Sequence, residues 1–540
     1  MGIIWLLIKA SWVSVAVAIV AGLISGGCSA RLIALINTAI QQNIPQSLLV
    51  PFAGLTLLVL FSGSLSQFLL IDLAQDSVYQ LRLNLSRRIL AAPLRQLEHL
   101  GPNRLLAVLT EDVQAISNTV FIIPFLCIDI AIIGGCLIYL GVLSGWLFLA
   151  VIIFLIIAIA LVQILIGYAH HYLKRTRKEM DRLLKHFRSI TDGIKELKLH
   201  SVRRHNFLDN DLTTSAGAAC HYQKTALKIG AVASSGGQLL FFVLVGLLIF
   251  GLPQVVPDAN AVLSAYILTL TYLLGPINNL VQQLPNLAIA DVSIKKVNEM
   301  GLALSAHAEL DTVTRQPAIA TWHTLKLQQV IHTYQSKDTE HPFTVGPIDL
   351  TLTSGELVFI VGGNGSGKST LAKLITGLYM PESGELSLDG TPIIDTNREW
   401  YRQHFSTIFS DFYLFERLVS LENDTLDSQA QAYLKTLELE KKVSVNDGQL
   451  STTELSQGQR KRLALLGAYL EDRPIYLFDE WAADQDPVFR EIFYTQLLAD
   501  LKQRGKTLLV ISHDDHYFHL ADRIIKLDYG RIESDGAIAP

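Results

Sequence analysis

The chain has 540 residues, of which half are hydrophobic and only 17% are charged, and its mean hydropathy is +0.35. This composition excludes a disordered chain and an ordinary water-soluble enzyme, and the length suits two or three domains. The formal net charge of -5 provides no basic surface for nucleic acid, and the four cysteines are too few and too scattered for a disulfide framework or a zinc site.

Three stretches almost without charge occupy the first half of the chain, at residues 10–71, 113–173 and 229–290. They contain one charged residue each, Arg31, Asp129 and Asp258. A membrane-spanning helix needs about 20 apolar residues, so each stretch accommodates two helices and a short turn. The sequence therefore predicts six spans, with turns at 41–47, 141–145 and 251–260.

Basic residues indicate which ends of the spans face the cytoplasm. The three turns contain no Lys or Arg, whereas residues 72–112 contain five and residues 174–228 contain thirteen. Because basic residues near span ends stay on the cytoplasmic side, we expect both long connections and both termini there. Apolar residues at helical spacing predict that the connections are helical hairpins, whose ends near 97–106 and 194–211 contact a cytoplasmic domain.

The character of the sequence changes after Met300. Residues 306–321 are mixed and aperiodic, which indicates a linker. From residue 322, short β-branched runs and glycine-rich turns are typical of an α/β domain. The predicted domains are an all-α six-helix transmembrane domain at 1–305, the linker at 306–321, and an α/β domain at 322–540.

A glycine-rich run follows the apolar strand 357–361 and opens a helix. This is a complete phosphate-binding loop (P-loop), in which backbone amides and a helix N-terminus surround the phosphates. Its expected ATP-binding residues are Gly362, Gly363, Asn364, Gly365, Ser366, Gly367, Lys368, Ser369 and Thr370. Among these, Lys368 is expected to reach the β- and γ-phosphates and Ser369 to ligate Mg²⁺.

A second apolar strand, at 475–478, ends in two adjacent acids. Asp479 at the strand end suits Mg²⁺, and Glu480 suits the orientation and polarisation of an attacking water. Beside a complete phosphate-binding loop, this pair predicts in-line phosphoryl transfer to water rather than a solvated strand end.

Between these strands, the turn Leu455-Ser456-Gln457-Gly458-Gln459-Arg460 opens a helix. With the loop and the acidic pair, it makes the sequence similar to the ATP-binding cassette (ABC) family. The resemblance implies that the signature residues Ser456, Gln457, Gly458 and Gln459 face the ATP held by the opposite subunit. It also implies that Asp484 lies in a subunit-crossing loop, that His513 senses the γ-phosphate in catalysis, and that Tyr334 stacks on adenine.

Two positions depart from the family pattern. Gln457 stands where the signature usually has Gly, and Ser410 stands where a Gln normally ligates Mg²⁺ and links the cassette to the membrane domain. Asp411 or a water is an alternative magnesium ligand there. Because one chain has one P-loop and one signature turn, the resemblance predicts a homodimer with twelve spans and two composite ATP sites.

Six spans followed by one cassette resemble bacterial ABC exporters of the inner membrane, with the cassette in the cytoplasm. Residues 478–487 and 405–411, with Trp481 after the catalytic acid, look like the branch that exports cyclic peptides and peptide siderophores, of the pyoverdine, syringomycin and microcin type. The expected cargo is a mature peptide or related secondary metabolite. Two alternatives stay open: an exporter or flippase of lipid or hydrophobic drugs, and an ATP-gated membrane regulator without transport.

The last predicted span carries a row of polar side chains, which is costly in lipid unless they face protein or water. This row predicts a hydrated cargo cavity lined by Tyr266, Tyr272, Asn279, Gln282 and Gln283. Hydrogen bonding between helices is an open alternative for each of them. Both roles, toward cargo and between helices, also stay open for Arg31 and Asp129. An isolated Asp in a span binds a cationic cargo, carries a proton or pairs with a residue on another helix.

Overall fold

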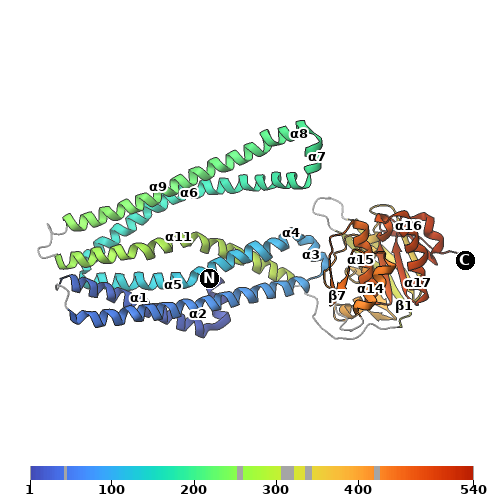
Figure 1. The fold of residues 1–540 in the computed structure, drawn as a ribbon, viewed down its shortest axis with the longest axis horizontal. Coiled ribbons are helices and arrows are strands. Elements are labelled where there is room, and N and C mark those ends of the chain that lie inside the picture. The colour runs from blue at the N-terminus through green and yellow to red at the C-terminus, as the bar shows by residue number, and fades with distance from the viewer. Residues whose placement is uncertain are drawn as a thin grey trace. The chain divides into compact units, whose positions relative to one another are not determined.

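The computed structural model describes residues 2–41, 46–251, 260–305, 321–334, 343–418 and 426–538. The chain divides into two compact units, one comprising residues 1–82 and 110–297 and the other residues 83–109 and 298–540. The first unit is helical, and the second contains the α/β domain (Figure 1). The predicted linker at 306–321 lies outside the described residues except for Thr321.

Long helices build the first unit. They are α1 (Gly2–Gln41), α2 (Leu49–Leu90) after the short η1 (Gln46–Leu48), α5 (Val113–Leu143), α6 (Gly145–Asp192), α9 (Thr213–Gly246) with η4 (Leu247–Gly251), and α11 (Asn260–Ser305). Five stretches are long and apolar enough to cross a membrane by length and composition: Trp12–Gln41, Gln46–Leu90, Pro102–Leu143, Gly145–Asp192 and Ser201–Gly251. The sixth predicted span falls within α11. Among the described residues, no stretch of α11 meets the same criterion of length and hydropathy, so the sixth span stays a prediction.

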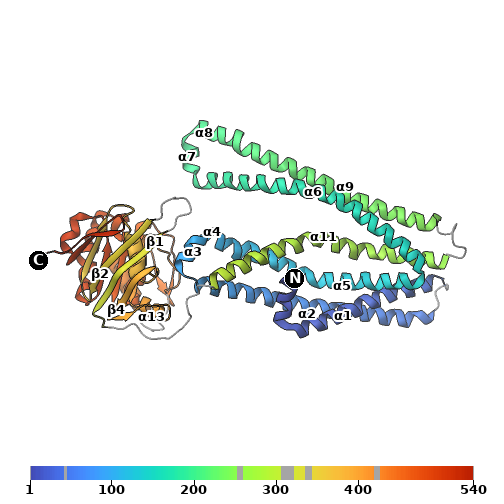
Figure 2. The same ribbon diagram turned by 180° about the vertical axis from the view of Figure 1, so that it is seen from behind.

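One predicted turn and one predicted hairpin agree with the helix ends. Helix α5 ends at Leu143 and α6 begins at Gly145, within the turn expected at 141–145. Helices α6 and α9 run side by side in both views and are joined by α7 (Ile194–Leu199), α8 (Ser201–Asn206) and η3 (Phe207–Leu212) (Figures 1 and 2). Residues 42–45 and 252–259, which make up most of the other two turns, lie outside the described residues.

Small residues bring the helices of this unit into close contact. A Cβ on Gly26 of α1 would lie 2.5 Å from the carbonyl carbon of Ala131 on α5, so only glycine permits this approach. The Ser66 hydroxyl on α2 donates to the Ala18 carbonyl on α1 at 2.8 Å. Such backbone approach and interhelical hydrogen bonding hold helices together where lipid provides no hydrophobic drive.

Two sheets form the framework of the α/β domain. The first is antiparallel, in the order β2 (Phe343–Thr353), β1 (Thr324–Tyr334), β4 (Ser383–Leu388), β5 (Thr391–Pro392). The second has the order β12 (Arg531–Ala537), β11 (Arg523–Asp528), β3 (Leu357–Gly362), β10 (Thr507–Ile511), β9 (Ile475–Asp479), β6 (Phe405–Ile408), and all its strands except β12 are parallel. A small hairpin, β7 (Val445–Asn446) and β8 (Gln449–Leu450), completes the strands.

Helices cover the parallel sheet and form two hydrophobic cores with it. They are α12 (Lys368–Ile375), α13 (Arg398–Arg402), α14 (Leu426–Thr436), α15 (Gln457–Glu471), α16 (Pro487–Ile492) with η6 (Phe493–Leu497), and α17 (Leu498–Gln503), together with the short η5 (Trp481–Asp484) and η7 (Asp515–Leu520). The strands β3, β9 and β10 are buried almost throughout, as their uninterrupted apolar runs predict.

Two short helices from the first half of the chain belong to the second unit. These are α3 (Leu94–Leu100) and α4 (Pro102–Ala107), followed by the π-turn η2 (Val108–Asp112). The sequence places them in the transmembrane domain, but residues 83–109 group with the α/β domain because α3 contacts it through polar side chains.

Candidate functional site

The predicted catalytic residues meet at one edge of the parallel sheet. The phosphate loop follows β3, Asp479 ends β9, and His513 follows β10, which lies between these two strands. Ile511 of β10 is in register with Asp479 of β9 and with Ile360 of β3. Because parallel strands end at a common edge, three distant segments of the sequence meet there.

The P-loop takes backbone conformations that require glycine. Gly362 and Gly367 have φ values of 151° and 102°, and a Cβ at Gly362 would collide with the carbonyl of Leu527. Gly363, Asn364 and Gly365 are exposed, so the loop is open to a ligand. Leu371 closes the first helical bond onto the Gly367 carbonyl at 2.8 Å, so α12 starts directly at the loop, as phosphate binding requires.

The Lys368 side chain folds back onto the phosphate loop. Its Nζ donates to the carbonyls of Gly362 and Gly363 at 2.9 Å each, and the residue is only 6% exposed. Burial lowers the pKa of the Lys368 ammonium, and the nearby carboxylates of Glu480 and Asp479 act in the opposite direction. The ammonium therefore lies between the phosphate loop and the acidic pair. It is already desolvated there, before any phosphate binds.

The Asp479 carboxylate fits a magnesium ion. Burial raises its pKa, while the Ser369 hydroxyl and the main-chain amide of Ser410 act in the opposite direction. Its Oδ1 atom is buried without a hydrogen-bond partner in the described part of the chain. A desolvated carboxylate oxygen beside a hydroxyl is the donor set that Mg²⁺ prefers. Ser410 therefore reaches this cluster through its backbone, whereas Asp411 is exposed.

Glu480 and His513 face each other at the same edge. The Nε2 atom of His513 lies 3.2 Å from Oε1 of Glu480, and their side chains are 45% and 38% exposed. Glu480 has a left-handed φ of 50°, and its amide donates to the Ile511 carbonyl on β10 at 3.0 Å. The structure thus brings together the two residues expected to act in catalysis and leaves them accessible.

Tyr334 ends the antiparallel strand β1 with its ring 48% exposed. Its register partner is Phe343 on β2, and a Cβ placed on Gly367 would lie 3.5 Å from the Phe343 ring. An exposed aromatic face so near the phosphate loop is suited to stacking on a base.

A turn that the sequence analysis missed supports the phosphate loop. The amide of Gly530 donates to the Ser366 carbonyl at 2.9 Å, and the Gly530 carbonyl accepts from Gly346 on β2 at 2.7 Å. The Tyr529-Gly530 turn therefore joins the two sheets at the loop, with positive φ at both positions. The sequence signal for such a turn was the Asp-Tyr-Gly triplet at 528–530, directly after the short strand-like run 523–527.

The signature turn caps its own helix. Ser456 is the N-cap of α15, and its side chain and that of Gln459 form a reciprocal capping box with the backbone. Ser456 and Gln457 are exposed. Gly458 packs against the loop that contains Asp484, because a Cβ there would lie 2.9 Å from the Asp484 carbonyl oxygen.

Trp481, the residue that carries the narrower resemblance, is a packing residue. It is 1% exposed, stacks on Phe493 at 4.3 Å between ring centroids, and donates its indole N–H to the Lys461 carbonyl at 2.9 Å. It therefore fixes the loop after Glu480 onto α15 rather than contacting a ligand.

Ion pairs connect α3 to the nucleotide-binding domain. Glu98 lies 2.7 Å from Nζ of Lys373 on α12, and it also accepts from the Tyr379 hydroxyl. Arg95 lies 2.7 Å from Glu382 and donates to the Thr333 carbonyl at 3.2 Å, one residue before the end of β1. Glu98 lies within the expected hairpin end at 97–106 and Arg95 lies just before it, but their charged partners were not predicted.

The predicted cavity residues on α11 behave differently from one another. Tyr266 is fully buried and donates to the carbonyls of Leu140 and Ser144 at 2.8 and 2.9 Å, which is the hydrogen bonding between helices that the sequence leaves open as an alternative. Asn279 hydrogen-bonds the Asp129 carboxylate on α5. Tyr272, Asn279 and Gln282 are exposed, and Gln283 is half-buried and accepts from Asn286 on the same helix. Arg31 on α1 is exposed.

Comparisons with known proteins agree with this geometry. The chain matches the ABC transporter family over residues 345–483 and the ABC transporter transmembrane region over residues 11–201. It is 39% identical over 524 residues to the ATP-binding protein SyrD of Pseudomonas syringae pv. syringae, which covers 95% of this chain and 93% of that protein. It is 30% identical over 242 residues to the ATP-dependent lipid A-core flippase of Bordetella avium, which covers 42% of this chain and 40% of that one.

A solved structure gives the same fold. A bacterial Atm1-family ABC exporter with ATP bound aligns with a TM-score of 0.72 over 98% of this chain and 95% of that chain. The sequence identity is 17%, so this likeness shows the fold alone.

Proposed function

Because the chain belongs to the ABC exporter family as a half-transporter with one membrane domain and one cassette, we propose that it exports a cyclic peptide, a peptide siderophore or a related secondary metabolite across the bacterial inner membrane. The observation that carries the proposal is the meeting of Lys368, Asp479, Glu480 and His513 at one sheet edge, in a chain that also contains a transmembrane region. The cassette and both termini face the cytoplasm in this proposal.

The residues at the sheet edge suggest how ATP is hydrolysed. Glu480 is accessible and orients the attacking water, while His513 is within hydrogen-bond distance of Glu480 and donates to the γ-phosphate. The Lys368 ammonium stabilises negative charge on the phosphates. Bound Mg²⁺, held by Asp479 and Ser369, would neutralise phosphate charge.

Two copies of the chain are needed for a complete ATP site in this proposal. The exposed Ser456 and Gln457 lie at the N-terminus of the 15-residue helix α15, which favours an anion. In the described residues, neither side chain bonds to the phosphate loop of its own chain. A second chain therefore supplies the signature turn for each nucleotide, and the chain acts as a homodimer.

The cargo is inferred from α11 and from the relatives. Tyr272, Asn279 and Gln282 present hydroxyl and amide groups that suit a peptide backbone. The near full-length similarity to SyrD is consistent with the narrower resemblance carried by Trp481 and residues 405–411. A lipid is the second candidate, since the chain is also similar to a lipid A-core flippase over part of its length.

Purified protein in liposomes tests the proposal. A cyclic peptide should raise ATPase activity and accumulate in inverted vesicles, and Glu480→Gln should abolish both responses while ATP still binds. Stimulation and movement of lipid alone would favour the flippase. Hydrolysis without accumulation of any cargo would favour an ATP-gated regulator.

A further inference from the structure

The side chain that distinguishes this signature turn from the usual one is engaged within its own chain. Gln457, which replaces a glycine of the family pattern, donates from Nε2 to Oδ2 of Asp484 at 3.1 Å. Asp484 closes the short η5 turn that follows Glu480, and its side chain is 40% exposed. The turn expected to face the partner's ATP is therefore bonded to the loop that follows the catalytic glutamate of its own site.

A buried lysine one turn further along α15 completes this connection. Nζ of Lys461 lies 2.7 Å from the same Oδ2 of Asp484 and donates to the main-chain carbonyl of Glu480 at 2.8 Å. Lys461 is only 3% exposed. A single ammonium thus holds both the Asp484 carboxylate and the backbone from which the Glu480 side chain extends.

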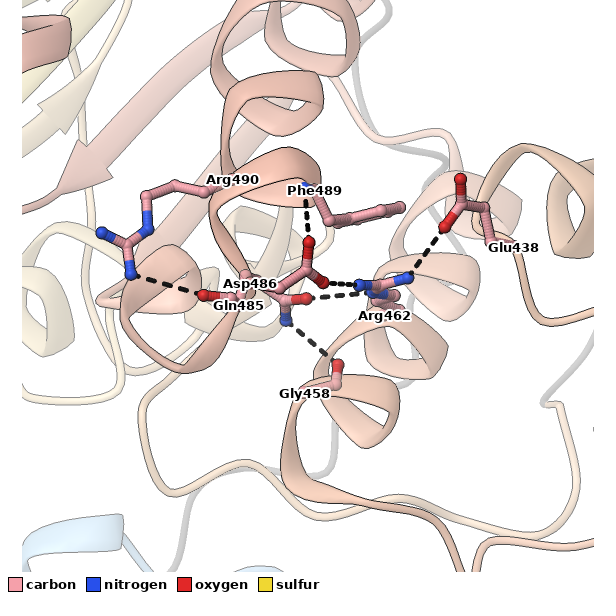
Figure 3. Close-up of polar contacts among 7 residues, drawn as sticks. All are labelled: Glu438, Gly458, Arg462, Gln485, Asp486, Phe489 and Arg490. Atoms are coloured by element: carbon pink, nitrogen blue, oxygen red, sulfur yellow. Dashed lines mark hydrogen bonds and ion pairs between the residues drawn. The ribbon is translucent and has the colours of Figure 1, made fainter.

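A second set of contacts keeps the signature helix and the Asp484 loop together (Figure 3). Arg462 donates to Gln485 at 3.0 Å and Gln485 donates back to the Gly458 carbonyl at 3.0 Å. Arg490 then links the Gln485 carbonyl, at 3.3 Å, to the carboxylate of Asp514, at 3.5 Å. Since Asp514 follows His513 directly, these contacts connect the signature turn to the segments that carry both catalytic side chains.

We propose that Gln457 and Lys461 are positioning residues that couple the two ATP sites of the dimer. Engagement of the signature turn with the partner's nucleotide sets, through Asp484, the placement of Glu480 in the site of the same chain. The physical reason is that two acceptors compete for the exposed side-chain amide of Gln457. One is the Asp484 carboxylate, its present acceptor, and the other is the partner's phosphate, which is favoured at this helix N-terminus. The inference rests on the proposed homodimer, and a glycine at this position offers no such side chain.

Mixed dimers separate an effect within one chain from an effect across the interface. Two differently tagged chains are co-expressed and purified over both tags, with Glu480→Gln silencing one site. In the first dimer, Gln457→Gly lies on the chain with the active Glu480. In the second, Gln457→Gly and Glu480→Gln lie on the same chain, so the altered signature turn faces the active site from the partner. Both are compared with a dimer that carries only the single Glu480→Gln change.

The proposal expects the first dimer to lose kcat about fivefold, as for one intramolecular hydrogen bond of about 1 kcal/mol, and by at least about threefold more than the second. An equal loss in both dimers, a larger loss in the second, or no loss in either would overturn it. A homodimer of Glu480→Gln that still hydrolysed ATP at the wild-type rate would instead refute the proposed function.

Substitution of Lys461 provides an independent measurement. Lys461→Met should lower kcat about tenfold while changing the KM for ATP less than about twofold, because Lys461 holds the catalytic loop rather than the nucleotide. Lys461→Arg should restore part of kcat. The matched control is Lys441→Met, at an exposed lysine on the same domain. A KM effect as large as the kcat effect, or no kcat effect, would contradict the positioning role.

Discussion

Replacing Glu98 by Gln tests whether the contact of α3 with the nucleotide-binding domain couples cargo binding to ATP hydrolysis. Glu98 bonds to Lys373 at 2.7 Å and to the Tyr379 hydroxyl. Lys373 lies on α12, the helix that begins at Lys368. The contact therefore reaches, along one short helix, the residue expected to bind the β- and γ-phosphates.

The burial of the pair sets the expected size of the effect. The Glu98 and Lys373 side chains are 32% and 21% exposed. Fully exposed pairs contribute about 0.2–1 kcal/mol and breaking a buried pair costs about 3–5 kcal/mol. We therefore expect Glu98→Gln to weaken the binding of α3 to the nucleotide-binding domain by about 1–2 kcal/mol. This corresponds to roughly 5- to 30-fold in the equilibrium between bound and released α3. The Arg95–Glu382 pair remains and should keep α3 near the domain.

The measurement is ATPase activity in liposomes with and without cargo. Glu98→Gln should remove most of the stimulation by cargo, while the rate without cargo stays within about twofold of wild type, because no atom of Glu98 belongs to the ATP site. Glu385→Gln, an exposed glutamate on β4, is the matched control. If Glu98→Gln kept full stimulation, or if Glu385→Gln lost as much, the reasoning about this contact would be refuted.

Three further substitutions probe the ATP site and its support. Tyr334→Ala should raise the KM for ATP about tenfold, since stacking on a base contributes about 1–3 kcal/mol, whereas Tyr334→Phe should retain most of the affinity; equal KM values for both would exclude stacking. Gly458→Ala should lower kcat several-fold, because its Cβ would lie 2.9 Å from the Asp484 carbonyl oxygen and one of the two backbone segments must shift; an unchanged kcat would show that this approach is not needed for activity. His332 stacks on Tyr379, and burial lowers the pKa of its imidazole. Below pH 6.5 the unfolded chain therefore binds a proton at this residue that the folded chain does not bind. The free energy of unfolding should fall as the pH drops from 6.5 through the folded-state pKa. His332→Phe should flatten this fall in melting curves, and an unchanged pH dependence would speak against the assignment.

The features predicted well from sequence are those encoded locally. The phosphate loop needs particular glycines between a strand and a helix, and Asp479 and Glu480 adjoin one another on the chain, so pattern alone identifies them. Their meeting with His513 follows from the strand order, in which β10 lies between β3 and β9. That order comes with the family resemblance and not from any short stretch of sequence.

The features predicted poorly depend on partners that are distant in sequence. Tyr266 was expected either in a cargo cavity or in a hydrogen bond between helices, because a polar group in an apolar span needs a polar partner. That partner proved to be the backbone carbonyls of Leu140 and Ser144, at the end of α5. Glu98 and Tyr379 are 281 residues apart, and no periodicity in either segment points to the other.

The position of β10 in the parallel sheet has a consequence for biosynthesis. Residues 507–511 pair with β3 on one side and with β9 on the other, and β11 at 523–528 is the second neighbour of β3. The phosphate-loop strand at 357–362 therefore has no neighbour in its sheet until the ribosome has made residues 507–511. A nascent or truncated chain that lacks β10 then holds its nucleotide motifs apart, so it cannot consume ATP before this strand has been made.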